Sequence, residues 1–185
     1  MNTRPYSKVL NFAWYQLIWF TAVLGGSAFE WLLALLVFMH LALIASWRRE
    51  LALMTSVALL GCSVDALLTK AGYFQFAESS WLPIPLWHMA IWVGFAGTLR
   101  HSLTFMVERP RLMTLAAMIF APITYLAAQR LGAVTFPIGD LPTAIVIGLS
   151  WLTITPLILW LTAVANGALV STRQAEAPGV SIQEQ

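Results

Sequence analysis

Several ionisable side chains stand inside strongly apolar stretches of this 185-residue chain, namely His40, Asp65, His88, Arg100 and His101. A charged group near the centre of a membrane-spanning helix costs about 3 kcal/mol, so such residues usually face the interior of a helix bundle and mark a functional site. A carboxylate beside an imidazole can hold and pass a proton. Asp65 and His88 are therefore candidates for general acid–base chemistry or for binding a lipid headgroup.

The elements that must position these side chains are apolar segments of membrane-spanning length, which is about 20 residues. The chain is 59% hydrophobic and only 10% charged, whereas a soluble domain carries roughly 25% charged residues. We predict an all-α, polytopic membrane helix bundle with six transmembrane helices, forming a single domain over residues 1–170. A disordered cytoplasmic tail is expected over residues 171–185. The predicted helices cover residues 9–24, 29–46, 51–69, 85–106, 112–129 and 143–169.

The distribution of basic residues predicts the orientation of this bundle. An even number of spans places both termini on one side, and that side carries most of the Lys and Arg residues. By the positive-inside rule both termini of this multi-pass membrane protein are cytoplasmic. The first apolar run also resembles a cleavable secretory signal, but its bulky aromatic residues favour a retained helix. The cytoplasmic set is Arg4, Lys8, Arg48, Arg49, Arg109, Arg111 and Arg173, against Lys70 and Arg130 on the other side.

Counting along the predicted helices places the buried ionisable groups in two layers. Asp65 and His88 lie about one turn below the outer ends of their helices, close to Glu30 at the same surface. His40 and His101 lie in a second layer, nearer the inner surface. Both layers involve the second, third and fourth helices, so the predicted site is built by these three.

The site residues follow from this placement. Asp65, His88 and His101 are the predicted catalytic residues. In the fourth helix, predicted as continuous over residues 85–106, Gly94, Thr98, His101 and Ser102 share one stripe because of their helical spacing. Small residues on such a stripe let another helix approach closely. The predicted substrate-binding residues are Trp87, Trp92, Thr98, Ser102, Arg100, His40 and Glu30.

Other interpretations of the polar groups remain open. His40 and His101, at matched depth, could be the axial ligands of a b-type haem. A metal site is not predicted, because the histidines never occur at the short helical spacings of metal-binding motifs. The polar groups could also serve only to hydrogen-bond one another within the bundle.

Composition excludes other classes of site and partner. Cys62 is the single cysteine, so the chain can form no internal disulfide and no CxxC metal site. The formal net charge of +2 is small and divided among the loops, so no nucleic-acid partner is expected.

Three groups of sequence motifs extend over nearly the whole chain. They are Asn11-Phe12 with Gln16 and Trp19-Phe20, then Asp65-Ala66-Leu67-Leu68 with Gly72, and finally Leu86-Trp87, Trp92 and the run from Phe95 to Leu103. These motifs resemble those of an uncharacterised bacterial inner-membrane family, the domain of unknown function DUF2878. The resemblance implies a multi-pass protein of a bacterial inner membrane with no established activity. The genes of this family lie near cyclopropane-fatty-acid-synthase-like enzymes, which implies a role in membrane-lipid modification.

The function expected from sequence is an accessory or enzymatic role in membrane-lipid or fatty-acyl modification, with membrane lipids and lipid-modifying enzymes as partners. Whether the chain is itself an enzyme stays open, as does its oligomeric state. A small transporter or transporter subunit is the first alternative, although no internal repeat of the kind found in many transporters is visible. A structural partner of another membrane protein is the second.

Overall fold

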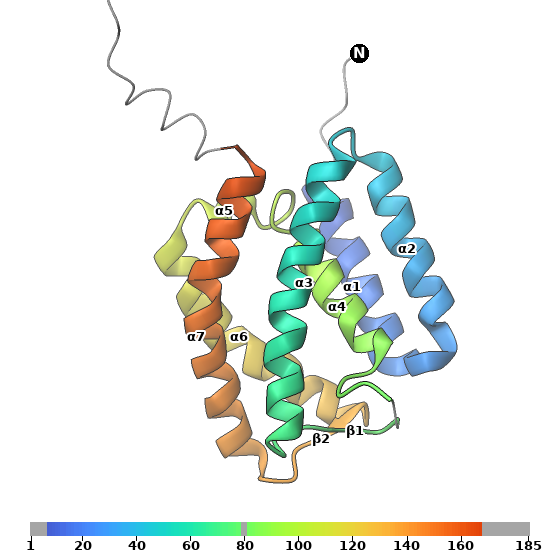
Figure 1. Ribbon diagram of the computed structural model, residues 1–185, viewed down its shortest axis with the longest axis vertical. Coiled ribbons are helices and arrows are strands. Elements are labelled where there is room, and N and C mark those ends of the chain that lie inside the picture. The colour runs from blue at the N-terminus through green and yellow to red at the C-terminus, as the bar shows by residue number, and fades with distance from the viewer. Residues whose placement is uncertain (1–6, 79–80, 168–185) are drawn as a thin grey trace, which may run out of the picture.

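The computed structural model describes residues 7–78 and 81–167, so the predicted tail over residues 171–185 lies outside the described residues. The fold is all-α, as predicted, with one short strand pair in addition (Figure 1). In chain order the elements are α1 (Lys8–Gly25), the 3-10 helix η1 (Gly26–Phe29), α2 (Glu30–Leu43), α3 (Trp47–Lys70), β1 (Gln75–Phe76), α4 (Leu86–Ala96), α5 (Thr104–Val107), α6 (Pro110–Arg130), β2 (Val134–Thr135) and α7 (Asp140–Ala165).

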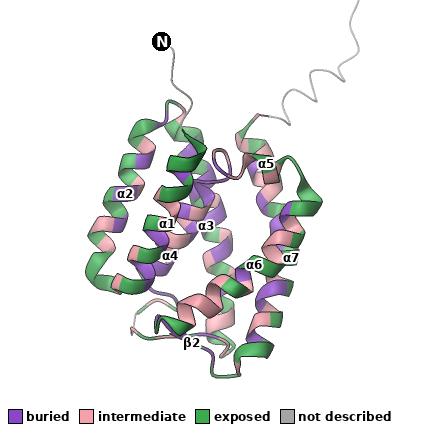
Figure 2. Ribbon diagram, turned by 180° about the vertical axis from the view of Figure 1, so that it is seen from behind, coloured by how far each residue is buried: buried purple, intermediate pink, exposed green. Residues whose placement is uncertain are grey.

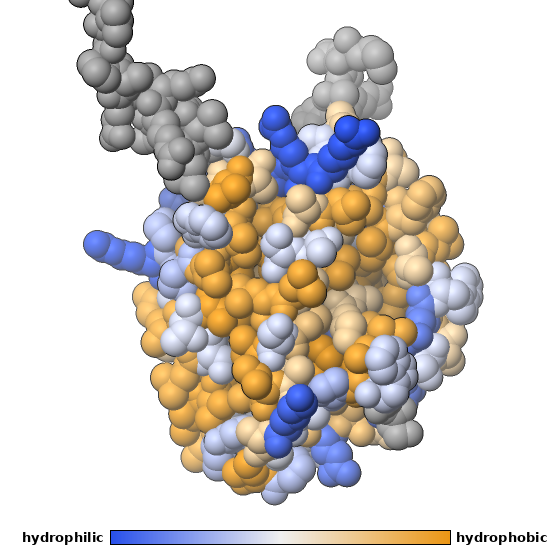
Figure 3. All heavy atoms as spheres, in the orientation of Figure 1, coloured by the Kyte–Doolittle hydropathy of each residue, from blue (hydrophilic) through white to orange (hydrophobic). Residues whose placement is uncertain are grey.

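Four helical segments are long and apolar enough to cross a membrane: Lys8–Leu43, Trp47–Lys70, Pro110–Arg130 and Asp140–Ala165. The first of them folds back on itself, with α1 and α2 joined by η1 (Figure 1). Large apolar side chains cover the flank of the bundle seen in Figure 3, and the most hydrophilic residues gather mainly toward its two ends. These features are those of a multi-pass membrane protein.

Helix α3 occupies the centre of the bundle. It packs against α4 and α7, while α1 packs against α4 and α6 against α7. Buried residues line the inward faces of the helices, and the outward faces of α2 and α7 are largely exposed (Figure 2). Val57 of α3, Ile158 of α7 and Leu99 after α4 are fully buried in the main apolar cluster. The central position of α3 lets its polar side chains meet residues from several other helices.

The prediction of one continuous fourth helix over residues 85–106 is wrong. Helix α4 ends at Ala96, and residues 97–103 form consecutive turns before the four-residue α5. Asn11 of α1 stabilises this break, because its side-chain amide donates to the Gly97 carbonyl at 3.0 Å. The Asn11 side-chain oxygen accepts from the Ser102 backbone N–H at 3.1 Å and from the Ser102 hydroxyl at 2.6 Å. These bonds satisfy backbone groups of the turns, which is what buried non-helical backbone in a membrane protein requires.

The third helix also begins earlier than predicted, at Trp47 rather than residue 51. The backbone N–H groups of Arg49 and Glu50 both donate to the Ser46 carbonyl, which starts the helix before the charged residues. Residues 47–50, which lie between the predicted second and third helices, are thus the first residues of α3. Their position within α3 places the Glu50 carboxylate inside the protein.

A short antiparallel strand pair ties two distant connections together. Residue Gln75, after α3, pairs with Thr135, after α6, and Phe76 pairs with Val134. Phe74 packs beneath this pair, stacked on Tyr125 at a ring-centroid distance of 5.2 Å. The strand pair therefore fixes the lower end of α6 relative to α3 (Figure 1).

Candidate functional site

The first cluster of polar side chains, the Asp65 cluster, consists of Asp65, His88, Trp92 and Tyr125. Asp65 is 2% exposed. Its Oδ2 atom lies 2.7 Å from His88 Nε2 and accepts hydrogen bonds from the Trp92 indole N–H and the Tyr125 hydroxyl, each at 2.6 Å. Three helices, α3, α4 and α6, thus meet at one carboxylate oxygen.

Local sequence places the donors of this cluster. His88 and Trp92 are four residues apart on α4, so they share one face of that helix. Trp92 lies directly over Gly61 of α3, where a Cβ atom would come within 2.2 Å of the indole ring. The indole also stacks on Trp151 of α7 at a centroid distance of 5.0 Å. Gly61 and Trp151 therefore hold the Trp92 N–H on the Asp65 carboxylate.

An apolar cavity of about 240 Å³ lies beside the Asp65 cluster. His88, Trp92 and Tyr125, which all contact Asp65, line this cavity, whereas Asp65 itself lies behind them. Ligand pockets for drug-sized molecules have volumes of about 300–1,000 Å³, so this cavity is smaller than such pockets. The rest of the wall is mostly aromatic or small and apolar, including Phe12, Tyr15, Trp19, Trp87, Phe95, Ala116, Ala117 and Ala121.

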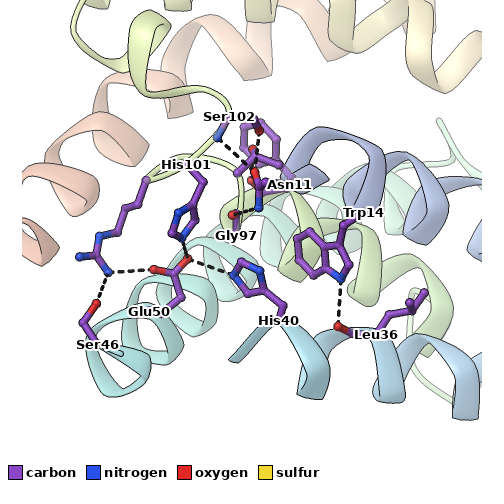
Figure 4. Close-up of polar contacts among 12 residues, drawn as sticks. Asn11, Trp14, Leu36, His40, Ser46, Glu50, Gly97, His101 and Ser102 are labelled. Atoms are coloured by element: carbon purple, nitrogen blue, oxygen red, sulfur yellow. Dashed lines mark hydrogen bonds and ion pairs between the residues drawn. The ribbon is translucent and has the colours of Figure 1, made fainter. Parts of the chain in front are cut away.

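The second cluster, the Glu50 cluster, consists of His40, Glu50, Arg100 and His101 and lies near the opposite end of α3. The Glu50 side chain is fully buried. Its Oε1 atom lies 3.2 Å from His40 Nε2 and 3.1 Å from His101 Nε2 (Figure 4). Its Oε2 atom accepts a hydrogen bond from the Arg100 guanidinium at 2.8 Å. The break between α4 and α5 supplies two of these residues.

Ligation of a b-type haem by His40 and His101, which the sequence left open, does not fit this arrangement. The rings of His40 and His101 are 5.4 Å apart and nearly perpendicular, at 85°. Both Nε2 atoms point to the same oxygen of Glu50 (Figure 4). A porphyrin would have to pass between the two imidazoles, where the Glu50 carboxylate stands.

Comparison with known proteins identifies the family of the chain. The family described as "Protein of unknown function (DUF2878)" matches residues 8–157. The chain belongs to this family. The resemblance expected from the sequence motifs is thereby confirmed. No curated protein and no solved structure matches the chain.

In this DUF2878 protein the predicted site residues fall into separate places. His88 and Trp92 join Asp65, whereas His40, Arg100 and His101 join Glu50. Thr98 and Trp87 line the cavity, and Ser102 binds Asn11 at the helix break. Glu30 begins α2 and belongs to neither cluster. The predicted catalytic residue His101 is therefore not beside Asp65 and His88, but in the other cluster.

Sequence reasoning missed Glu50 and Tyr125. Tyr125 lies 60 residues from Asp65 and shares no motif with it. Glu50 had a usable signal, because the buried residues Glu50, Met54, Val57, Gly61 and Asp65 of α3 are spaced three or four apart. Extending the apolar face of α3 backward by one turn would have placed Glu50 inside the bundle.

Proposed function

We propose that this DUF2878 protein binds an acyl chain of a membrane lipid in the apolar cavity and acts on it through the Asp65 cluster. The observation that carries the proposal is the position of His88, Trp92 and Tyr125. Each contacts the Asp65 carboxylate and each lines the cavity. A buried carboxylate is costly to maintain in a membrane protein, and such groups are usually functional. Here the donors that hold the carboxylate line an apolar cavity.

The chemistry that suits this cluster is proton transfer. Asp65 orients the His88 imidazole, as a carboxylate does in many acid–base pairs, and the pair holds a proton next to the cavity. The Tyr125 hydroxyl donates its proton to Asp65 Oδ2, so its oxygen can accept a hydrogen bond from a bound polar group. An acyl carboxyl, ester or hydroxyl entering the cavity would meet these groups. Modification of a lipid at such a position is the function we propose.

The arrangement in the membrane is part of the same proposal. We place six membrane passages at α1, α2, α3, the α4–α5 segment, α6 and α7, with both termini cytoplasmic in a bacterial inner membrane. In support, the start of α3 and the end of α7 lie at the same end of the bundle (Figure 1). Among the described basic residues, Lys8, Arg48, Arg49, Arg109 and Arg111 would then be cytoplasmic, and Lys70 and Arg130 external.

Two linked measurements test the lipid proposal. The first compares the lipids of a deletion strain with those of strains complemented by wild type, Asp65→Asn or Asp140→Asn. Asp140 is the matched control because its carboxylate is exposed and contacts Arg130. We expect wild type and Asp140→Asn to reverse a specific acyl or headgroup change, and Asp65→Asn to leave it in place. Equal complementation by all three, at equal expression, would show that the Asp65 cluster does not act on lipids.

The second measurement asks whether the cavity holds a lipid. Native mass spectrometry of the purified protein should detect a retained lipid in wild type and in Ile119→Phe, whose side chain is exposed on α6. The Ala117→Phe variant fills the cavity and should lose that lipid. If both variants retained the same amount of lipid, the lipid would not bind in this cavity, and the proposal of acyl-chain binding would lose its support.

One observation favours transport as a second candidate function. The break between α4 and α5 leaves non-helical backbone inside the bundle, next to Arg100 and His101. Discontinuous helices beside buried charges form the binding sites of many transporters. Ion-coupled uptake by proteoliposomes, abolished by Glu50→Gln and kept by Asp140→Asn, would favour transport over lipid modification.

A further inference from the structure

The Glu50 cluster has the donor set of a metal site. His40, His101 and Glu50 each offer one ligand atom, an imidazole nitrogen or a carboxylate oxygen, and these three atoms all lie within 4.8 Å of one another. We propose that these three residues bind a divalent transition-metal ion, for which Zn²⁺ is the best fit. Two imidazoles and one carboxylate are a known ligand set for zinc with an open fourth position. The sequence spacing predicted no metal site, because the three ligands come from different parts of the chain.

Both histidine-to-carboxylate distances agree with tetrahedral coordination. Zinc lies about 2 Å from each nitrogen or oxygen ligand, so two ligands in a tetrahedron are roughly 3.3 Å apart. His40 Nε2 and His101 Nε2 lie 3.2 Å and 3.1 Å from Glu50 Oε1. The perpendicular arrangement of the two imidazole rings keeps them from colliding as they approach one point. An ion therefore requires only small movements of these side chains.

Neighbouring residues hold the His40 ligand in place. The imidazole stacks on Trp14 at a centroid distance of 4.2 Å, with 15° between the planes. The Trp14 indole is fixed in turn by donating to the Leu36 carbonyl at 2.9 Å (Figure 4). Gly97 leaves the space that these rings occupy, since a Cβ there would lie 2.9 Å from Trp14 and 3.2 Å from His40 Nε2. Such outer contacts orient the ligands of metal sites.

The Glu50 ligand is oriented by Arg100. The guanidinium binds Oε2 at 2.8 Å and is itself held by the Asn166 side chain at 2.9 Å. Because Arg100 binds Oε2, the other carboxylate oxygen, Oε1, is the one that faces the two histidines and would bind the ion. Because Arg100 and the ion are both positive, the open fourth position favours an anionic ligand, of which hydroxide is the simplest.

An ion can reach this site from one side. The His40 and Glu50 side chains are fully buried, whereas the His101 side chain is 15% exposed and that of Arg100 is 16% exposed. These two partly exposed residues, His101 and Arg100, both lie in the break between α4 and α5. This proposal is separate from the lipid proposal, because the Asp65 cluster is about four helical turns away along α3.

The test is metal titration of the full chain, purified in detergent and stripped with a chelator. Co²⁺ is the probe, because tetrahedral Co²⁺ absorbs visible light far more strongly than octahedral Co²⁺. We expect a saturable tetrahedral spectrum with one ion per chain, displaced by Zn²⁺. Glu50→Gln should weaken Co²⁺ binding at least about tenfold. The matched control Glu108→Gln, which makes the same change at an exposed carboxylate outside the cluster, should bind as wild type does.

A ligand exchange distinguishes coordination from a structural effect. His101→Cys should still bind Co²⁺ and should add a sulfur-to-cobalt charge-transfer band, which only direct ligation produces. An octahedral spectrum, absence of binding by wild type, or a His101→Cys spectrum without that band would overturn the proposal. If Glu50→Gln does not fold, the ligands of zinc-loaded wild type can be determined by X-ray absorption spectroscopy instead. A spectrum with two imidazoles and one carboxylate as the protein ligands supports the site, and any other set of protein ligands rejects it.

Discussion

Glu50 and Asp65 lie on the same buried face of α3, about four helical turns apart. Each carboxylate is surrounded by donors from other elements: Asp65 by α4 and α6, and Glu50 by α2 and the α4–α5 break. A buried carboxylate is costly unless it is hydrogen-bonded and paired. The two carboxylates of α3 therefore each form the centre of a polar cluster, one toward each end of this helix.

The first prediction concerns the stability provided by Asp65. Asp65→Ala leaves three buried donors without their acceptor and should lower the free energy of unfolding by about 3–5 kcal/mol. Asp65→Asn keeps an acceptor oxygen and should lower the free energy of unfolding by less than Asp65→Ala does. Asp140→Ala, at an exposed pair with Arg130, should cost less than about 1 kcal/mol. Denaturant unfolding of the three variants in detergent measures this order. Equal losses for Asp65→Ala and Asp140→Ala would show that the donors do not depend on Asp65.

The second prediction concerns the contact between Gly61 and Trp92. A Cβ at residue 61 would lie 2.2 Å from the indole, so Gly61→Ala must displace Trp92 and weaken its bond to Asp65. We expect a loss of about 1–3 kcal/mol in unfolding free energy. Ser63→Ala, exposed on the same helix, should change it by less than about 0.5 kcal/mol. A tolerated Gly61→Ala would mean that Trp92 is not confined by α3.

The third prediction concerns the helix break. Asn11→Leu removes the acceptor and donor that satisfy Ser102 and Gly97, so the turns of residues 97–103 should open more often. Hydrogen–deuterium exchange in detergent should rise in this segment while the middle of α3 stays protected. Gln16→Leu replaces another amide of α1 and serves as the control. Unchanged exchange in Asn11→Leu would show that Asn11 does not maintain the break.

The fourth prediction compares two ion pairs in double-mutant cycles. Arg100 and Glu50 are 2.8 Å apart, with Glu50 fully buried, whereas Arg130 and Asp140 are 3.4 Å apart and largely exposed. We expect a coupling energy of about 2 kcal/mol for Arg100→Gln with Glu50→Gln. The Arg130→Gln and Asp140→Asn cycle should give less than about 1 kcal/mol. Similar coupling in both cycles would contradict the shielding of Glu50 from solvent.

Part of the candidate site was predictable from the sequence because it depends on depth along helices. Residue counting placed Asp65 near His88, and their side chains lie 2.7 Å apart. Counting also placed His40 and His101 in one layer, where their rings lie 5.4 Å apart. Depth follows from rise per residue, which is nearly constant in a helix. The chemical roles of these residues remain predictions.

The sequence by itself determined the class of the protein: hydropathy of whole segments predicts helices in a membrane, and spaced motifs place the chain in DUF2878. Only the tertiary structure decided that α4 ends at Ala96 and that Glu50 joins His40 and His101. The physical reason is the range of the interactions. Hydropathy is a sum over neighbouring residues in the sequence. The Asn11 side chain, in contrast, bonds backbone groups of Gly97 and Ser102, some ninety residues away. These bonds depend on how α1 packs against α4.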